Sequence, residues 1–221
     1  MTVQGIRIQA VILSKGHAAA AGYAVLARSG YFDPSLLETY CANGTSLAGH
    51  LTANDDTPGV ELSTGSLGHG LPVGTGMALA DARSGMSYRR VFVVMSDGEC
   101  DEGTTWEAAL FAAHHHLTSL CVIIDANGIQ SFGRVADVLA LEPLVAKWRT
   151  FGWDAVEIDG HDHAALTEAL FVVTPSRPRV IIARTVKGKG VLFMEDDLLW
   201  HYRSPDDAQL VVALDEIGNR R

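Results

Sequence analysis

Five short apolar segments, each about the length of one strand, most constrain how this chain can fold. They are rich in β-branched residues and apolar on both faces, which is typical of central parallel strands covered by helices on both sides. The segments are Ala10–Leu13, Val91–Met95, Leu120–Asp125, Asp154–Ile158 and Val180–Arg184.

Helix-like patterns separate these strands, at His17–Arg28, Leu67–Ala82, Thr104–His116, Glu142–Phe151, Ala164–Val173 and Pro205–Asp215. Thr104 or Thr105 is expected to cap the third helix, and Ser204 with Pro205 to begin the last. Strands that alternate with helices predict a single α/β domain over residues 1–221. We expect a doubly wound, mostly parallel sheet with helices on both faces, and a C-terminal helix and tail from about residue 205.

Composition excludes several classes of protein. The 221 residues are 48% hydrophobic and 19% charged, enough for one sizeable core. Lys+Arg 17 against Asp+Glu 26 gives a net charge of −9, which argues against a nucleic-acid partner. No run is long enough for a membrane helix, and no signal peptide is recognisable. The 3 cysteines include no CxxC pair, which favours a reducing, cytoplasmic location.

Polar and glycine-rich segments follow each expected strand. They are Ser14–His17, Ser96–Glu102, Asp125–Gly128, Asp159–Asp162 and Thr185–Gly190. In open α/β sheets, ligands bind beyond the carboxyl ends of the strands. These segments are therefore expected to converge on one edge of the sheet and to form the functional site there.

Asp97 and Asn127 are the strongest candidates for metal ligands at this edge. A carboxylate, an amide oxygen and a nearby backbone carbonyl make a set of hard oxygen ligands that suits Mg²⁺. Gly98 would let the backbone approach phosphates closely. The alternative is that Asp97 caps a helix and Asn127-Gly128 forms an ordinary turn. Spacing alone leaves both interpretations open.

Glycines and histidines give weaker signals. The loop Gly65–Gly70 precedes a helix and suits a phosphate or the edge of a ring, or else Gly74 and Gly76 simply let that helix pack closely. His114–His116 are consecutive and point in different directions on a helix, which argues against a zinc site. The loop histidines His17, His50 and His201 gain meaning only if they share a pocket.

In their order along the chain, these segments resemble the N-terminal, diphosphate-binding domain of transketolases. The similarity runs from about Val11 to Pro205. The thiamine diphosphate fingerprint of that family is Gly-Asp-Gly followed by an Asn, and it reads here as Ser96-Asp97-Gly98 with Asn127. Further similar blocks are Ser14–His17, Pro58–Glu61, Thr64–Gly68, Glu102–Ala108, Asp159–Asp162 and Lys187–Gly190.

The resemblance implies roles in cofactor binding. Asp97 and Asn127 would ligate Mg²⁺ or Ca²⁺ through their side chains, and Ile129 through its carbonyl. Gly98 would contact the diphosphate of thiamine diphosphate. Gly65 and Leu67 would hold the aminopyrimidine ring, and Glu102 would join cofactor sites across a dimer.

The resemblance also implies catalytic roles for three histidines. His17 and His201 would lie close to the diphosphate or the thiazolium ring, and His50 would face the substrate. The implied reaction moves a two-carbon unit from a ketose (phosphate) donor to an aldehyde. The cofactor supplies the carbanion, and histidines near neutral pKa shuttle protons.

The pyrimidine-binding domain of the family, with its activating glutamate, has no counterpart in this sequence. We expect a separate subunit to supply it in an α2β2 heterotetramer, with sugar or keto compounds as substrates. The sequence departs from the family at Ser96, at His69 where Gln is usual, and in lacking a Gly-His motif before Ser14. Alternatives are deoxyxylulose-phosphate synthase-like or 2-oxo acid dehydrogenase-like chemistry, or a non-catalytic regulatory subunit.

Overall fold

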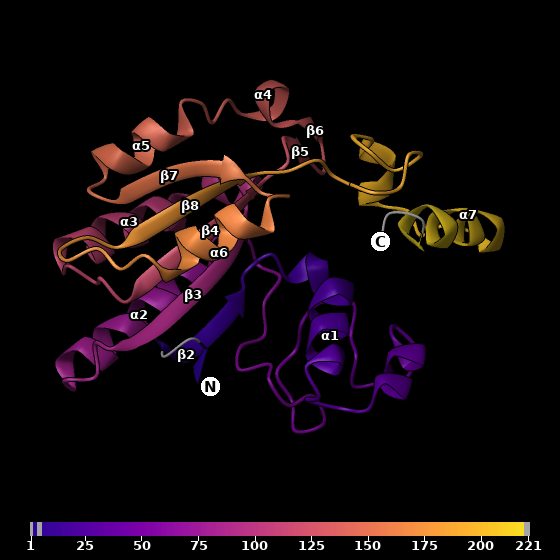
Figure 1. The fold of residues 1–221 in the computed structure, drawn as a ribbon, viewed down its shortest axis with the longest axis horizontal. Helices are drawn as coiled ribbons and strands as arrows, with labels where there is room; N and C mark the ends of the chain where they lie inside the picture. Colours follow the sequence, from indigo (N-terminus) through magenta and orange to yellow (C-terminus); the bar gives the residue numbers. More distant parts are fainter. Residues whose placement is uncertain (1, 4–5, 219–221) are drawn as a thin grey trace.

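A six-stranded sheet runs through the computed structural model, which describes residues 2–3 and 6–218 (Figure 1). The strand order is β1-β2-β3-β4-β8-β7, with β1 antiparallel to β2 and all other neighbours parallel. The strands are β1 Thr2–Val3, β2 Ile6–Leu13, β3 Arg89–Ser96, β4 Leu120–Ala126, β7 Asp154–Asp159 and β8 Arg179–Arg184. The predicted α/β class and mostly parallel sheet are confirmed. The short edge strand β1 was not predicted.

Helices cover both faces of this sheet (Figure 1). Residues of α2 Gly70–Arg83, α3 Gly103–His114 and α5 Leu144–Thr150 pack in the larger core cluster, and α6 His163–Phe171 packs on the other face. The other helices are α1 Ala19–Arg28, which packs in a separate small cluster, α4 Val135–Val138, and α7 Asp207–Gly218, which lies apart from the sheet (Figure 1). Short 3₁₀ turns cover Gly16–Ala18, Pro34–Thr39, Asp97–Asp101 and Leu198–His201, and a small hairpin joins β5 Ile129–Gln130 to β6 Gly133–Arg134.

Strand β3 shows how the sequence divides the core between two layers. Successive side chains of a strand point to opposite faces. Val91, Val93 and Met95 accordingly pack in the large cluster that includes residues of α2, α3 and α5. Phe92 instead packs in a smaller cluster with Ala169 of α6. The central part of β3, Val91–Met95, is apolar throughout because both of its faces are buried.

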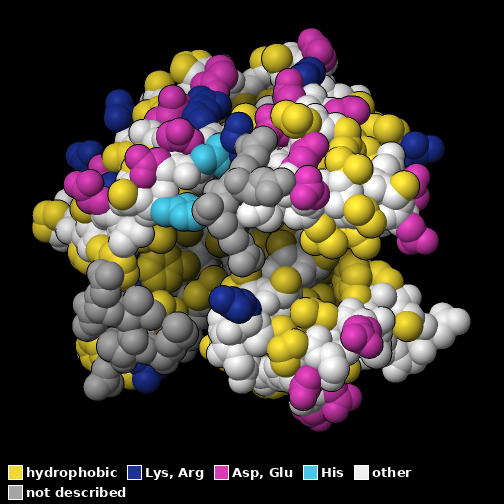
Figure 2. Space-filling model, turned by 45° about the vertical axis from the view of Figure 1, so that its right-hand side comes forward, with side chains coloured by type: hydrophobic (Ala, Val, Ile, Leu, Met, Phe, Trp, Pro, Cys, Tyr) yellow, Lys and Arg dark blue, Asp and Glu magenta, His cyan; other side chains and the backbone are white. Residues whose placement is uncertain are grey.

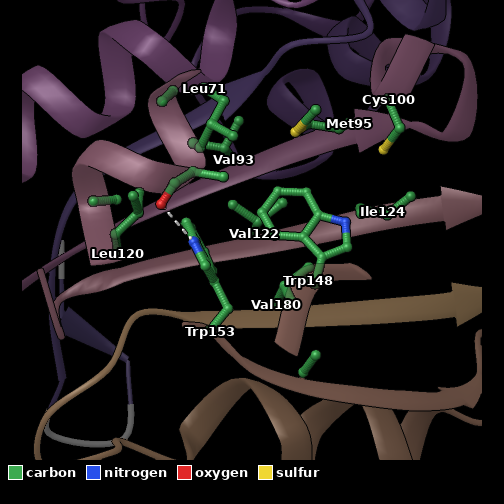
Figure 3. Close-up of a cluster of buried hydrophobic side chains, with 14 of the residues drawn as sticks. Leu71, Val93, Met95, Cys100, Leu120, Val122, Ile124, Trp148, Trp153 and Val180 are labelled. Atoms are coloured by element: carbon green, nitrogen blue, oxygen red, sulfur yellow. Dashed lines mark hydrogen bonds between the residues drawn. The ribbon is translucent and has the colours of Figure 1, made fainter. Parts of the chain in front are cut away.

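Two tryptophans anchor the larger core (Figure 3). Trp148 on α5 and Trp153 before β7 are both fully buried, with ring centroids 4.9 Å apart. The indole Nε1 of Trp153 donates to the Ala109 carbonyl on α3 at 2.9 Å, so its one polar atom is satisfied inside the core (Figure 3). Truncating either ring would cost on the order of 3–5 kcal/mol. This pair fixes α3 and α5 against the sheet.

The observed α2 begins at Gly70, later than the predicted start at Leu67. Gly65 and Gly68 have φ values of 144° and 76°, outside the helical region. The segment before Gly70 is therefore a loop, and this glycine pattern belongs to the candidate site rather than to the helix.

The predicted helix caps were wrong. At α3 the cap position is Glu102, while the hydroxyls of Thr104 and Thr105 donate to backbone carbonyls of other segments. Helix α7 begins after Asp206, not at Pro205. The Asp206 carboxylate accepts from the N–H of Gln209 at 2.8 Å, and the Gln209 side chain accepts from the N–H of Asp206 at 3.0 Å. This reciprocal pair outcompetes Ser204. Of the predicted C-terminal tail, residues 219–221 lie outside the described residues.

Charged side chains of both signs lie on the surface of this chain, whose net charge is −9 (Figure 2). On the face drawn in Figure 2, Lys and Arg side chains are scattered among Asp and Glu. Within residues 2–3 and 6–218, no helix has both the length and the apolar character needed to cross a membrane.

Gly74 and Gly76 both lie on α2, but only one is closely packed. A Cβ at Gly74 would lie 2.6 Å from Cγ2 of Val93, whereas a Cβ at Gly76 would meet nothing within 4 Å. We expect Gly74→Ala to lower the free energy of unfolding by about 1–3 kcal/mol. Gly76→Ala, the matched control, should raise it by roughly 0.5–1 kcal/mol, because alanine favours the helix. Urea denaturation measures both changes, and equal effects would contradict close packing of α2 on β3.

Candidate functional site

Segments that follow β2, β4 and β8 meet at the carboxyl edge of the sheet, as predicted. A cavity of about 370 Å³ opens there, lined by Lys15, Asp125, Asn127, His161, Thr185, Val186, Lys187 and Gly188. The Lys15 ammonium lies 2.5 Å from a carboxylate oxygen of Asp125, and the Thr185 hydroxyl donates to the same carboxylate. The parallel order β2-β3-β4-β8 places these strand ends side by side.

Asp97 lies buried at the end of β3, beside the segment that follows β4. One carboxylate oxygen accepts from the N–H of Gly98 and the other from the N–H of Gly128, both at 2.8 Å. Burial raises the pKa of Asp97, and the two backbone donors oppose that rise. These bonds connect Asp97 to the turn that carries Asn127, so the structure brings the two predicted ligands close together.

Asn127 occupies the turn between β4 and the β5–β6 hairpin. Its Oδ1 accepts from the N–H of Ile129 at 3.0 Å, and its Nδ2 donates to Asp125 at 3.4 Å. Gly128 has φ 76°, which favours glycine at this turn. Ile129 is buried, so its side chain anchors the hairpin.

These oxygen atoms fit a divalent cation. Asp97 is only 4% exposed, and the described chain shows no Lys, Arg or His within ion-pair distance of its carboxylate. A buried carboxylate is costly unless it is paired or bound to a metal. Each Asp97 oxygen accepts one N–H and keeps further lone pairs for a cation. In the described residues, no cluster of three or more His, Cys, Asp or Glu forms an alternative metal site.

The fingerprint tolerates serine in place of its first glycine. Ser96 has φ −88° and ψ 162°, an extended conformation open to any residue. A Cβ on Gly98 would make only ordinary contacts, the nearest at 3.5 Å from Gln130. The substitution at Ser96 therefore introduces no backbone strain into the site.

The three predicted histidines lie near one another. The rings of His17 and His201 have centroids 5.7 Å apart. His50 lies against Gly65, where an added Cβ would come within 2.8 Å of the His50 ring. The Nδ1 atom of His201 is buried and has no hydrogen-bond partner in the described chain. An unpartnered buried nitrogen is costly, so a ligand that supplied a partner would stabilise this arrangement.

Positive charge is concentrated around these histidines. Loss of water around the His17 ring, together with the charges of Lys15, His201 and Lys187, lowers the pKa of His17 from 6.5 to about 4, although the residue keeps an exposed side. Burial, Lys187 and Lys15 lower the pKa of His201 as well. Burial and Lys15 lower that of Lys187. An anion bound among these groups would relieve their repulsion, which fits a diphosphate.

The glycine loop 65–70 packs tightly against the segment Ser14–Gly16 that follows β2. A Cβ at Gly16 would lie 2.5 Å from the Thr64 carbonyl carbon, and one at Gly70 would lie 2.3 Å from the Ser14 hydroxyl. Leu67, half-buried in this loop, accepts at its carbonyl from Nδ1 of His69 at 2.9 Å. His69 therefore turns back onto its own loop, which leaves Gly65 and Leu67 as the loop residues predicted to hold a ring.

Glu102 differs from the other predicted residues because its side chain is exposed, at the start of α3. The base of its side chain lies next to the glycine loop, since a Cβ on Gly68 would come within 2.6 Å of the Glu102 Cβ. The predicted contact across a dimer needs an exposed side chain, and Glu102 has one.

Several residues of the edge were not selected from the sequence. Glu99 is fully buried and accepts from the Ser14 hydroxyl, from the N–H of Ser96 at 3.0 Å and from the N–H of Gly68 at 3.1 Å. Lys15, Asp125, Thr185 and Lys187 lie in the strand-end segments already noted. Opposite charges at the carboxyl ends of two predicted strands, β2 for Lys15 and β4 for Asp125, were the signal that would have found this pair.

Comparison with known proteins identifies the family. Residues 7–204 match the family model described as transketolase, thiamine diphosphate binding domain. The chain belongs to the transketolase family. An apulose-4-phosphate transketolase subunit of Actinobacillus succinogenes is 42% identical over 207 residues, which are 93% of this chain and 74% of that protein. The 6-deoxy-6-sulfo-D-fructose transketolase subunit SqwG of a Clostridium species is 40% identical over 193 residues, 86% of this chain and 70% of that protein.

Solved transketolases share the fold. The transketolase of Campylobacter jejuni superposes with a TM-score of 0.85 at 29% identity, covering 95% of this chain and 34% of that one. A transketolase complex from Pichia stipitis gives a TM-score of 0.84 at 29% identity, covering 95% of this chain and 32% of that one. The chain thus spans about a third of the length of the solved transketolases.

The low pKa of His17 gives a direct test of the anion site. By NMR, the His17 ring should titrate with a midpoint of about 4, and inorganic pyrophosphate should raise that midpoint because a nearby anion favours the imidazolium. Because the folded-state pKa lies below 6.5, the unfolded chain binds this proton more readily. His17 therefore lowers stability as the pH falls from 6.5 towards 4.

The control for this titration is His116, beyond the far end of α3, whose signals pyrophosphate should leave unchanged. A His17 midpoint that does not move with pyrophosphate would contradict the anion site.

Proposed function

We propose that this chain is the diphosphate-binding subunit of a two-chain, thiamine diphosphate-dependent transketolase. Together with a pyrimidine-domain subunit it would transfer a two-carbon ketol unit from a ketose (phosphate) to an aldehyde. The single observation that carries this proposal is the arrangement of charge at the carboxyl edge of the sheet. There the buried Asp97 carboxylate has no ion-pair partner among the described residues and lies near the positive charges of Lys15 and Lys187. A metal diphosphate would match both, with the cation at Asp97 and the diphosphate at the lysines.

The names of the relatives support a subunit rather than a whole enzyme. Two relatives are named as transketolase subunits, and the matches cover 74% and 70% of them. We therefore assign the activating glutamate and the pyrimidine pocket to a partner chain. We propose an α2β2 assembly, with Glu102 on the surface that faces a second active site.

The residues of this chain would bind the cofactor as follows. Asp97 and Asn127 would ligate Mg²⁺ or Ca²⁺ through side-chain oxygens, and Ile129 through its carbonyl. Gly98 and Lys187 would contact the diphosphate, while Gly65 and Leu67 would hold the aminopyrimidine. Thiamine diphosphate, when bound, would supply the nucleophilic carbon for the ketose carbonyl.

The histidines of this chain would manage protons around that carbon. With a pKa of about 4, His17 is neutral at pH 7 and can accept a proton. The lowered pKa of His201 keeps it neutral as well. His50, exposed beside Gly65, would donate to and orient the substrate hydroxyls. The three free cysteines fit a reducing compartment, and we place the enzyme in the cytoplasm.

Replacing Asp97 should remove the metal-dependent part of cofactor binding. We expect Asp97→Ala to abolish Mg²⁺-dependent binding of thiamine diphosphate, because it removes the one buried carboxylate at the metal position. Isothermal titration calorimetry with Mg²⁺, and then with a chelator, measures this. Asp81→Ala is the matched control, since Asp81 is a carboxylate of equal 4% exposure on α2. Equal binding by both variants would refute the metal assignment.

The two-chain proposal is tested by reconstitution. Mixed with a pyrimidine-domain subunit, the chain should transfer two carbons from ketose phosphates to aldehydes, and either chain alone should be inactive. Coupled assays over a panel of donors and acceptors measure the transfer. Pyruvate-dependent or decarboxylating activity instead would point to the synthase-like or dehydrogenase-like chemistry. A complex that binds the cofactor but turns over no substrate would point to a regulatory subunit.

A further inference from the structure

Asp125, the penultimate residue of β4, accepts hydrogen bonds from three side chains on three segments. Lys15 follows β2 and lies 2.5 Å away, Thr185 follows β8, and Asn127 donates through Nδ2 at 3.4 Å. None of the cofactor roles described above belongs to Asp125. Its carboxylate nevertheless joins the ends of β2, β4 and β8 beside Asn127, the proposed metal ligand.

The bond to Asn127 fixes the direction of an amide. An ionised carboxylate only accepts hydrogen bonds, so the Asn127 group that faces Asp125 is the NH₂ and not the oxygen. The Oδ1 atom then lies on the other side, where it accepts from the N–H of Ile129 at 3.0 Å. The neighbouring N–H, that of Gly128, donates to Asp97. The amide oxygen thus lies on the turn that Asp97 already contacts.

We propose that Asp125 is a positioning residue that directs the amide oxygen of Asn127 to the divalent cation. A flipped amide would present two N–H donors to the metal and could not ligate it. The inference rests on the proposed function, because it needs Asn127 as a metal ligand. Lys15 and Thr185 would in turn hold Asp125 in place.

The expected loss of Mg²⁺ affinity follows from comparable metal sites. Groups that orient metal ligands by hydrogen bonds typically change metal affinity by about 10–100-fold when they are removed. Asp125→Asn keeps the shape of the side chain but can turn its own NH₂ towards Asn127, which removes the fixed orientation. We expect the affinity for Mg²⁺ to fall about 10–100-fold at saturating thiamine diphosphate, with turnover restored at high Mg²⁺.

The experiment titrates Mg²⁺ into the chain with thiamine diphosphate and the pyrimidine-domain subunit, by calorimetry and by activity. Asp154→Asn is the matched control. Asp154 pairs with Arg179 at the opposite edge of the sheet, and its side chain is 31% exposed, against 30% for Asp125. This control should keep the wild-type Mg²⁺ dependence. Wild-type dependence in Asp125→Asn would overturn the inference.

Exchanging the two residues gives a rescue. In the double variant Asp125→Asn/Asn127→Asp, residue 127 presents an oxygen whichever way it turns and no longer needs orienting. Mg²⁺ affinity should return to within a few-fold of wild type. A double variant as weak as Asp125→Asn would mean that Asp125 only supports the fold, and the inference would fail.

NMR of the chain without cofactor separates orientation from charge. The Asn127 side-chain NH₂ signals should show one hydrogen-bonded proton in the wild type and lose it in Asp125→Asn. Unchanged signals together with weaker Mg²⁺ binding would leave only a charge effect and overturn the inference. A wild type that binds no thiamine diphosphate with its partner would overturn the proposed function as well, which distinguishes the two failures.

Discussion

The carboxylate of Glu99 is the interaction on which the carboxyl edge of the sheet depends. Fully buried after β3, it accepts from the Ser14 hydroxyl after β2 and from the N–H groups of Ser96 and Gly68. One group thus joins two strand ends and the glycine loop. Buried donors that lose their acceptor cost about 1–3 kcal/mol each, so these three segments are held in register together. The close approach of Gly70 to Ser14 depends on the same arrangement.

Around Glu99, negatively and positively charged side chains lie on different strand ends. Carboxylates lie at the ends of β3 and β4, while the cations come from the segments after β2 and β8. Lys15 belongs to both groups: it pairs with Asp125, and its charge also lowers the pKa of His17 and Lys187. Burial raises the pKa of Asp125, but Lys15 and its hydrogen-bond donors more than offset this and keep that pKa below its ordinary value. A bound cation would compensate the carboxylates, and a bound diphosphate would compensate the lysines. Either group bound alone would leave the other set of charges uncompensated.

The central strands β3, β4 and β8 were predictable because they are buried on both faces, which requires a nearly uninterrupted apolar segment. The boundaries of the helices were less predictable. Ser204-Pro205 has a good start signal, yet the reciprocal bonds between Asp206 and Gln209 begin α7 later. Local propensities at such positions differ by about 1 kcal/mol or less, so one side-chain contact decides between them. The role of Gly74 was also open, because only the distance to Val93 separates it from the unpacked Gly76.

The sequence by itself determined the α/β class, the family resemblance and the segments that follow each strand, because these depend on residue order and on burial of whole strands. It also named Asp97, Asn127 and the three histidines. Only the tertiary structure decided which of these groups lie together. It also decided that Glu99 and Asp125 join the segments that carry these groups, because Glu99 bonds to Ser14 and Gly68 and Asp125 bonds to Lys15 and Thr185, all far along the chain. Hydrogen bonds between distant segments leave no periodic trace in a sequence, since their partners are chosen by strand order and not by spacing.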